Sequence, residues 1–177
     1  MVRLIRTFCA LGIVAAGTMI APVPAQAAAI DALCPLGSDD ITFEPGIVLL
    51  EPRLTTMSAD FRTGECTTSV PGITSATLRN SGLLMRTCND LLGGGSGIAV
   101  LTWNDGTTTS TVAYTQTAVR GTVATVVTRT GTITGGLFAG DSVVVTETFA
   151  NLQFLACATP TGMTHTSGVA QTVITGP

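Results

Sequence analysis

Arg129 and Glu147 are the charged residues whose positions most clearly permit chemistry, because each stands alone among small and β-branched residues in an alternating run. The two runs are joined by "GGLFAGD", and a turn centred near Phe138 places Arg129 opposite Glu147 on an otherwise apolar face. Inside a barrel, this ion pair would line a cavity that holds a polar ligand. At a sheet end or on a solvated face it would be a cross-strand salt bridge, and we favour this structural role because such pairs are common.

His165 is the only histidine, so any histidine-dependent catalysis has to use it. A general base needs a hydroxyl or thiol nucleophile and an acid that orients it, and no serine stands in a G-x-S-x-G motif. The surrounding run "GMTHTSG" predicts that His165 is an outward-facing strand residue. The sequence therefore predicts a protein that is not an enzyme, and a hydrolase or cyclase with an unfamiliar site is the weakest alternative.

Acidic residues are candidates for glycoside hydrolysis or calcium binding, but their spacing supports neither. Most fall in expected turns or at strand ends, where acids usually cap the backbone or face solvent. The candidates are Asp39, Asp40, Glu44, Glu51, Asp60, Glu65, Asp90, Asp105, Asp141 and Glu147. The densest group, "LGSDDITFE", lacks the alternate acids of a calcium loop, and no phosphate loop or dinucleotide fingerprint occurs. We expect no cofactor and no metal.

Aromatic residues are few: one tryptophan, one tyrosine and six phenylalanines. Trp103 and Tyr114 fall on an expected core face and, with Arg129 and Glu147, are the candidate ligand-lining residues of a hollow barrel. Phe138, at the tip of "GGLFAGD", is the aromatic residue best placed to contact a partner. Because such tips commonly pack on themselves, we favour a side chain that folds back over the barrel end.

Residues 1–27 have the three parts of a secretory signal peptide. "MVRLIRTF" is basic, "CALGIVAAGTMIAPV" is apolar but short for a membrane span, and "PAQAAA" offers small residues at the cleavage positions. We expect cleavage after Ala27, with Ala28 and Ala29 as alternative last residues removed. A membrane anchor is disfavoured by the short apolar run and its prolines. The sequence predicts a secreted, extracellular protein in which 28–177 form one domain without a membrane span.

The predicted mature chain is modestly acidic, with six arginines, no lysine and eleven acidic residues. This charge disfavours nucleic acids and anionic membranes as partners. An extracellular protein, a glycan or a small molecule remains as the expected partner, and the protein itself is expected to be a monomer.

Alternating segments rich in Thr, Val, Gly and Ala follow the signal, interrupted by turn residues and without a sustained helical period. Eight strands are expected, at 41–50, 53–63, 73–86, 97–103, 108–119, 122–134, 141–150 and 163–174. The segment "CNDLLGGGSG" is expected to be a loop. Threonine would supply outward positions that favour strands yet tolerate water.

The turn "NDG" between the fourth and fifth strands is a strong hairpin signal. Pairing about this turn puts Trp103 opposite Thr108 and Ala99 opposite Val112. The shared core face then comprises Ala99, Leu101, Trp103, Val112 and Tyr114, while Thr102, Thr109 and Thr111 face outward. Since nearly all connections are short, the simplest fold is an all-β antiparallel meander that closes as a barrel or folds as a barrel-like sandwich.

Cys34, Cys66, Cys88 and Cys157 remain after signal removal, and without C-x-x-C spacing they favour disulfides over a metal site. In a meander, Cys34 and Cys66 lie at one end of the strands, and Cys88 and Cys157 lie at the other. A strand of a dozen residues spans about 40 Å, whereas a disulfide needs Cα atoms within about 7 Å. The topology therefore predicts Cys34–Cys66 and Cys88–Cys157.

Six segments carry a resemblance: "TFEPGIVLLEPR", "PGITSATL", "GSGIAVLTWNDGTTTSTVAYT", "GTITGGLFAGDSV", the late "LACATPTG", and a signal followed by a cysteine. Together they resemble a group of small, secreted, Thr/Gly-rich β-proteins of actinobacteria without a characterised activity. The resemblance implies export and a β-rich fold, and it brings no catalytic residues.

Two functions follow from these observations. The first is a secreted, non-enzymatic β-scaffold, stapled by disulfides, that acts by binding in the cell envelope or the extracellular medium. The second is a barrel that carries a small apolar or amphipathic ligand, with Arg129 and Glu147 near its interior. A central cavity would favour the second, and a solid core with an exposed apolar patch would favour the first.

Overall fold

The computed structural model describes residues 28–91 and 93–177, so the predicted signal peptide lies outside the described residues. Eight strands and two short helices make up this part of the chain. They are β1 (Ile30–Ile47), β2 (Arg53–Thr68), β3 (Ala76–Arg86), α1 (Cys88–Leu91), β4 (Gly95–Trp103), β5 (Thr109–Arg120), β6 (Ala124–Gly136), β7 (Ser142–Ala150), the 3₁₀ helix η1 (Asn151–Ala158) and β8 (Met163–Thr175).

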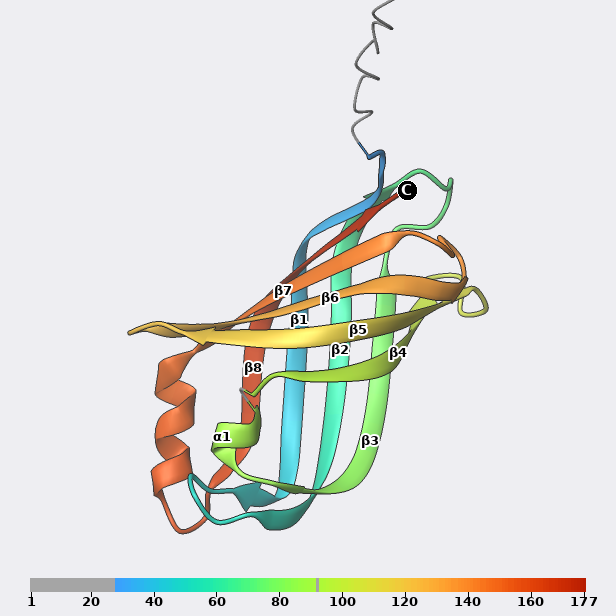
Figure 1. The fold of residues 1–177 in the computed structure, drawn as a ribbon. Coiled ribbons are helices and arrows are strands. Elements are labelled where there is room, and N and C mark those ends of the chain that lie inside the picture. Colours follow the sequence, from blue (N-terminus) through green and yellow to red (C-terminus); the bar gives the residue numbers. More distant parts are fainter. Residues whose placement is uncertain (1–27, 92) are drawn as a thin grey trace, which may run out of the picture.

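The strands form one closed antiparallel barrel in chain order, with β8 paired to β1. Figure 1 shows β1, β2 and β3 running lengthwise, with β5, β6 and β7 crossing them steeply. The predicted all-β meander of eight strands is confirmed, and it closes as a barrel rather than as two sheets. Among the described residues, neither helix has the length and apolar character needed to traverse a bilayer.

The largest errors in the predicted strand boundaries are in the first two strands. The first strand begins at Ile30 rather than at residue 41, and the second continues to Thr68. The expected loop after the third strand includes the helical turn α1, and η1 fills the connection before β8. Pro35 and Gly37 are unusual inside a strand, so the sequence pattern did not indicate a strand over the first part of β1. The strand accommodates them through register shifts against both neighbours.

The hairpin of β4 and β5 has the predicted register. Ala99 pairs with Val112, and the backbone N–H of Trp103 donates to the carbonyl of Thr108 at 2.9 Å. The Asp105 carboxylate accepts hydrogen bonds from the backbone N–H groups of Thr107 and Thr108, at 3.0 and 2.8 Å. These bonds explain why the "NDG" sequence turns the chain here.

Apolar side chains fill the barrel in two separate clusters. The first cluster includes Trp103, Leu101, Val112, Ile133, Val143 and Ile174. Phe138 packs on it, with its ring 5.5 Å from that of Trp103, so this residue folds back over the barrel end as predicted. The second cluster includes Ile41, Phe43, Ile47, Val127, Phe149 and Met163.

Several threonines contradict the expectation that threonine serves outward positions. Thr55, Thr63, Thr125, Thr166 and Thr172 are almost completely buried. Most are satisfied by local acceptors: the Thr55 hydroxyl donates to the Pro45 carbonyl at 2.6 Å, and the Thr125 hydroxyl to Asn151 Oδ1 at 2.8 Å. These buried hydroxyls thus join β2 to β1 and β6 to η1, a role that alternation alone does not reveal.

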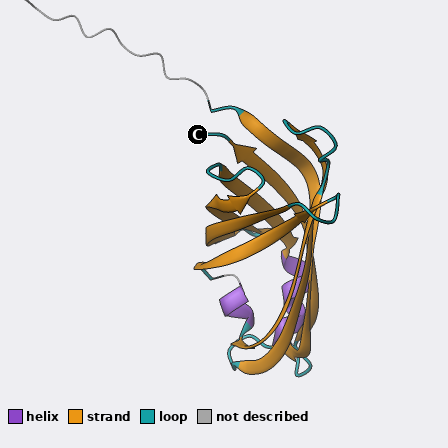
Figure 2. Cartoon of the chain, turned by 90° about the vertical axis from the view of Figure 1, so that its right-hand side faces the viewer, coloured by secondary structure: helices purple, strands orange, loops and turns teal. Residues whose placement is uncertain are grey.

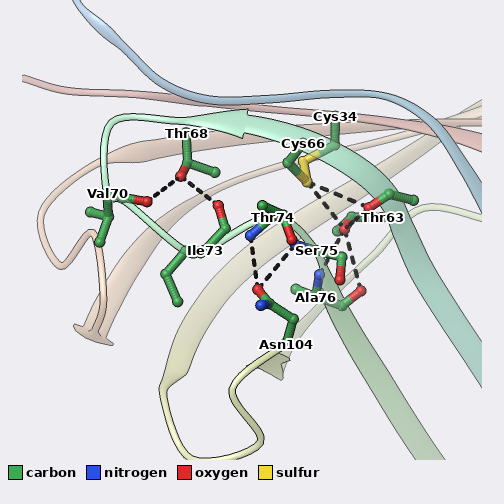
Figure 3. The surroundings of a disulfide bond; sticks show 11 residues. Cys34, Thr63, Cys66, Thr68, Val70, Ile73, Thr74, Ser75, Ala76 and Asn104 are labelled. Atoms are coloured by element: carbon green, nitrogen blue, oxygen red, sulfur yellow. Dashed lines mark hydrogen bonds between the residues drawn. A yellow bond between two sulfur atoms is a disulfide. The ribbon is translucent and has the colours of Figure 1, made fainter.

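The two disulfides are those predicted, Cys34–Cys66 and Cys88–Cys157, with Cα–Cα distances of 4.1 and 6.2 Å. The first joins neighbouring strands, beside the buried Thr63 hydroxyl (Figure 3). The second ties α1 to η1. Each bridge therefore connects two elements that lie at the same end of the barrel, as expected for a meander. Cys34–Cys66 is at one end and Cys88–Cys157 is at the other.

The barrel wall is unevenly paired. β2 and β3 pair from Arg53 to Arg62 of β2, whereas β3 and β4 pair only at Ala76–Trp103 and Thr77–Thr102. Beyond these two pairs the strands diverge, and α1 lies below β4 in the resulting space (Figure 2). We call this divergence of β3 from β4 the seam.

Candidate ligand-binding cavity

A cavity of about 260 Å³ lies inside the barrel and reaches the seam. Side chains from both apolar clusters line it, so it separates them along the barrel. Its apolar lining includes Ile41, Met57, Phe61, Leu78, Val127 and Phe149. The turn from α1 into β4, with Gly93, Gly94 and Gly95, borders it where the strands diverge.

Polar groups in the cavity converge on Arg129 of β6. Its Nε donates to Gln116 Oε1 at 3.0 Å, its Nη1 donates to Glu147 Oε1, and Nη2 lies 4.0 Å from Asp39 Oδ2. The guanidinium also lies 5.9 Å from the centroid of the Tyr114 ring. We call Asp39, Arg129 and Glu147 the buried charge cluster.

Arg129 and Glu147 lie inside the barrel, so the favoured placement at a sheet end or on a solvated face is wrong. The predicted register is also wrong, because Arg129 pairs with Val145 and Val127 pairs with Glu147. The register error is two residues, which preserves the face on which each side chain lies. The ion pair is thus diagonal across two strands rather than directly opposed, within reach of a long arginine side chain.

Asp39 reaches the cluster from β1, across β8. β8 pairs Ala170 with Glu147 and Gly168 with Asp39, which places only small residues between the two acids. A larger side chain at Ala170 would stand between the carboxyl groups. Asp39 was not predicted in this role, because β1 and β6 are not adjacent and no local sequence pattern indicates how close they lie.

Burial dominates the electrostatics of both acids. The side chain of Glu147 is 0 % exposed and that of Asp39 is 3 % exposed. Burial raises the pKa of Glu147 from 4.5 to about 7 against the opposing effect of Arg129. The pKa of Asp39 is also raised by burial, again against the attraction of Arg129.

Two of the acids' oxygens lack a hydrogen-bond donor among residues 28–91 and 93–177. These are Asp39 Oδ1 and Glu147 Oε2, both buried. One proton held between them would satisfy both, since a protonated carboxyl is a donor to a neighbouring carboxylate. With that proton the cluster carries one positive and one negative charge, and the desolvation cost of a second buried anion is avoided.

The predicted lining residues divide into two pairs. Arg129 and Tyr114 line the cavity, whereas Trp103 and Glu147 do not. Trp103 is a buried residue of the first apolar cluster, and its indole N–H donates to the Ser110 hydroxyl at 2.9 Å. Glu147, on β7, lies behind Arg129 as seen from the cavity and holds the guanidinium by a hydrogen bond. Gln116 and Asp39 were not predicted to line the cavity.

His165 is outside the barrel, with its side chain 55 % exposed and Nε2 at 3.6 Å from Asp40 Oδ1. This position agrees with the predicted outward strand residue, and it keeps the imidazole away from the cavity. Within the described part of the chain, no group of three histidine, cysteine or acidic side chains has an arrangement able to hold a metal ion.

Comparisons with known proteins provide no relative. No protein-family model matches the chain, and no match is found among curated proteins or among solved structures.

Proposed function

We propose that this protein is a secreted binding protein whose barrel holds one small amphipathic ligand in the cavity beside Arg129. The cavity is the observation that carries the proposal, because a solid scaffold would have joined the two apolar clusters into one core. An apolar chamber with a few convergent polar groups is the usual form of a small-molecule site. The two disulfides support an extracellular location, in which such bonds persist.

The volume of the cavity limits the size of the ligand. An apolar protein cavity of about 150 Å³ is large enough for benzene. A cavity of about 260 Å³ therefore suits a chain of roughly eight to ten carbons or a compact two-ring compound. The apolar walls favour a hydrocarbon body, while the buried charge cluster provides one polar position.

The seam supplies the entrance. Elsewhere in the barrel, neighbouring strands are closed by pairing, whereas β3 and β4 are joined by two residue pairs only. Gly95 borders the cavity here, and a Cβ built on it meets no atom within 4 Å. A ligand can therefore pass between the strands without disrupting backbone hydrogen bonds.

Binding is tested by calorimetry and by native mass spectrometry of protein purified from its own host. We expect a retained small molecule, or micromolar binding of an eight-carbon amphiphile at one site per chain. Ala59→Phe fills the cavity from β2 and should abolish binding, whereas Ala113→Phe, on the exposed face of β5, is the matched control. Retention of binding in Ala59→Phe would exclude this cavity as the site.

The entrance is tested separately by kinetics. Gly95→Trp should slow ligand association by about tenfold or more with little change in stability, because its side chain has open space beside the seam. Gly135→Trp is the control, since a Cβ there also meets no atom within 4 Å but the residue lies away from the cavity lining. Equal association rates in the two variants would argue for a different route.

A further inference from the structure

We propose that the cavity selects an uncharged amphiphile whose acceptor oxygen, from an ester, ketone, amide or alcohol, binds Arg129, and that it rejects carboxylates of the same length. This inference rests on the proposed function and specifies the chemistry of the ligand's polar end. It goes against the ordinary expectation that an arginine in an apolar pocket recognises an acid.

The charge of Arg129 is already balanced by the protein. Glu147 accepts a hydrogen bond from Nη1, and the Asp39 carboxylate lies 4.0 Å from Nη2. A ligand carboxylate would be a third acidic group beside one guanidinium. Binding it in the ionised form would bury a net negative charge in an apolar chamber, which is costly without a further cation.

Among residues 28–91 and 93–177, no second cation lies beside Arg129 to offset that charge. Arg86, the other basic residue that lines the cavity, lies on β3 at the seam, and the acidic residue Asp90 lines the same part of the cavity. The remaining groups that face Arg129 are Gln116 and Tyr114 from β5, which carry no positive charge. The charge balance at the inner end of the cavity is therefore set by the buried charge cluster alone.

Arg129 nevertheless retains donors for a neutral head group. Its Nη2 donates no hydrogen bond to any residue in the described ranges, and a quarter of its side chain remains exposed. A carbonyl, ester or hydroxyl oxygen accepts from such a group without altering the charge of the site. A protonated amine placed beside Arg129 would instead bring a second cation against the guanidinium, which has N–H donors and no acceptor to offer.

Three probes with the same eight-carbon chain separate these possibilities: methyl octanoate, the octanoate ion and octylamine. Isothermal calorimetry at pH 7 should show the ester binding at least about tenfold more tightly than either charged probe. Tighter binding of octanoate than of the ester would overturn the inference and leave the proposed function intact. Failure of all three probes, together with no retained molecule, would instead count against the proposed function.

A variant in which both acids are neutralised should reverse the preference between the probes, and such a reversal does not depend on differences in their solubility. Asp39→Asn with Glu147→Gln keeps the shape of both side chains but leaves Arg129 without a counter-charge, so octanoate should now bind more tightly than the ester. Asp40→Asn with Glu44→Gln removes the same number of carboxylates from exposed positions and is the matched control. It should keep the preference for the ester.

Glu147→Gln alone provides a check that survives if the double variant folds poorly. The glutamine amide can accept from Arg129 and donate to Asp39, so it reproduces the state with one shared proton. The preference for the ester at pH 7 should therefore be unchanged. A switch to octanoate in this single variant would show that Glu147 is the ionised acid that balances Arg129 and would contradict the placing of the shared proton on Glu147.

Discussion

The part of the barrel made of β8, β1 and β2, which we call the wall, differs from the seam in the extent of its strand pairing. β1 pairs with β2 from Ala32 to Glu44, and with β8 over nearly the same length, whereas β3 and β4 share two residue pairs. The wall brings Asp39 of β1 to 4.0 Å from Arg129, which is itself held by Glu147 of β7 and Gln116 of β5. The seam provides access to the space in front of Arg129. The strands that bring Asp39 to the cluster and the strands that open the cavity are therefore different parts of one closed sheet.

A barrel can therefore close without uniform pairing between all of its neighbouring strands. Two pairs at one end suffice to join β3 to β4, because Trp103 and Ala76 at that end belong to the first apolar cluster. At the other end, α1 occupies the space between the strands and is tied to η1 by Cys88–Cys157. A packed core and a covalent bond thus replace the missing ladder.

Removal of the second disulfide is the largest expected perturbation of this contrast. Cys88→Ser with Cys157→Ser opens a loop of 69 residues and should lower the free energy of unfolding by about 4 kcal/mol on the chain-entropy model. Cys34→Ser with Cys66→Ser, within the wall, should cost nearly as much. Denaturant unfolding measures both losses. Only the first variant should also weaken ligand binding, and equal effects on binding would break the distinction between wall and seam.

The buried charge cluster gives the next effect, a pH dependence of stability. The pKa of Glu147 is raised from 4.5 to about 7, so between these pH values the folded chain binds more protons than the unfolded chain. The contribution to stability is complete below about pH 4.5 and is lost as the pH rises through 7, with a total on the order of 3 kcal/mol.

Glu147→Gln should remove this pH dependence, because the amide cannot ionise. Melting temperatures of the variant and the wild type should be similar near pH 4.5, diverge as the pH rises from 4.5 to 7, and keep a constant difference above that, with the variant the more stable. Asp40→Asn, at an exposed neighbouring acid, should keep the wild-type slope. A parallel pH profile in the Glu147→Gln variant would show that Glu147 is ionised throughout the range.

Trp103→Phe tests the paired end of the seam on a smaller scale. The change leaves a gap in the first apolar cluster and removes the hydrogen bond to Ser110, at a cost of roughly 1 to 2 kcal/mol. Val100→Ala, at a half-exposed residue of the same strand, should cost less than about 0.5 kcal/mol. Comparable losses in the two variants would contradict the role given to Trp103.

Hydrogen exchange measures the difference in pairing between the wall and the seam without any substitution. Alternate amides of β4 between Gly95 and Leu101 face the seam and should exchange quickly, while their neighbours bonded to β5 are protected. Amides of β1 between Asp39 and Phe43 should exchange most slowly, since both edges of this strand are paired. Uniform protection along β4 would indicate that the seam is closed in solution.

Much of the architecture was predictable because its signals are local. Alternation located eight strands, "NDG" fixed one hairpin register, and short connections fixed the chain order. The disulfides followed from that order, since cysteines at opposite ends of long strands cannot meet. The errors were also local: Pro35 and Gly37 masked the start of β1, and a loop tip without a definite centre misplaced the β6–β7 register by two residues.

Which side chains face inward follows from the sequence, because the side chains of a strand alternate with a period of two and a register error of two residues leaves that assignment unchanged. Arg129 and Glu147 were thus paired correctly even in the wrong register. That Asp39 joins them across β8, and that β3 separates from β4 to open the cavity, could be seen only in the folded barrel. Both depend on how eight twisted strands close around a fixed interior, a global condition that no short stretch of residues records.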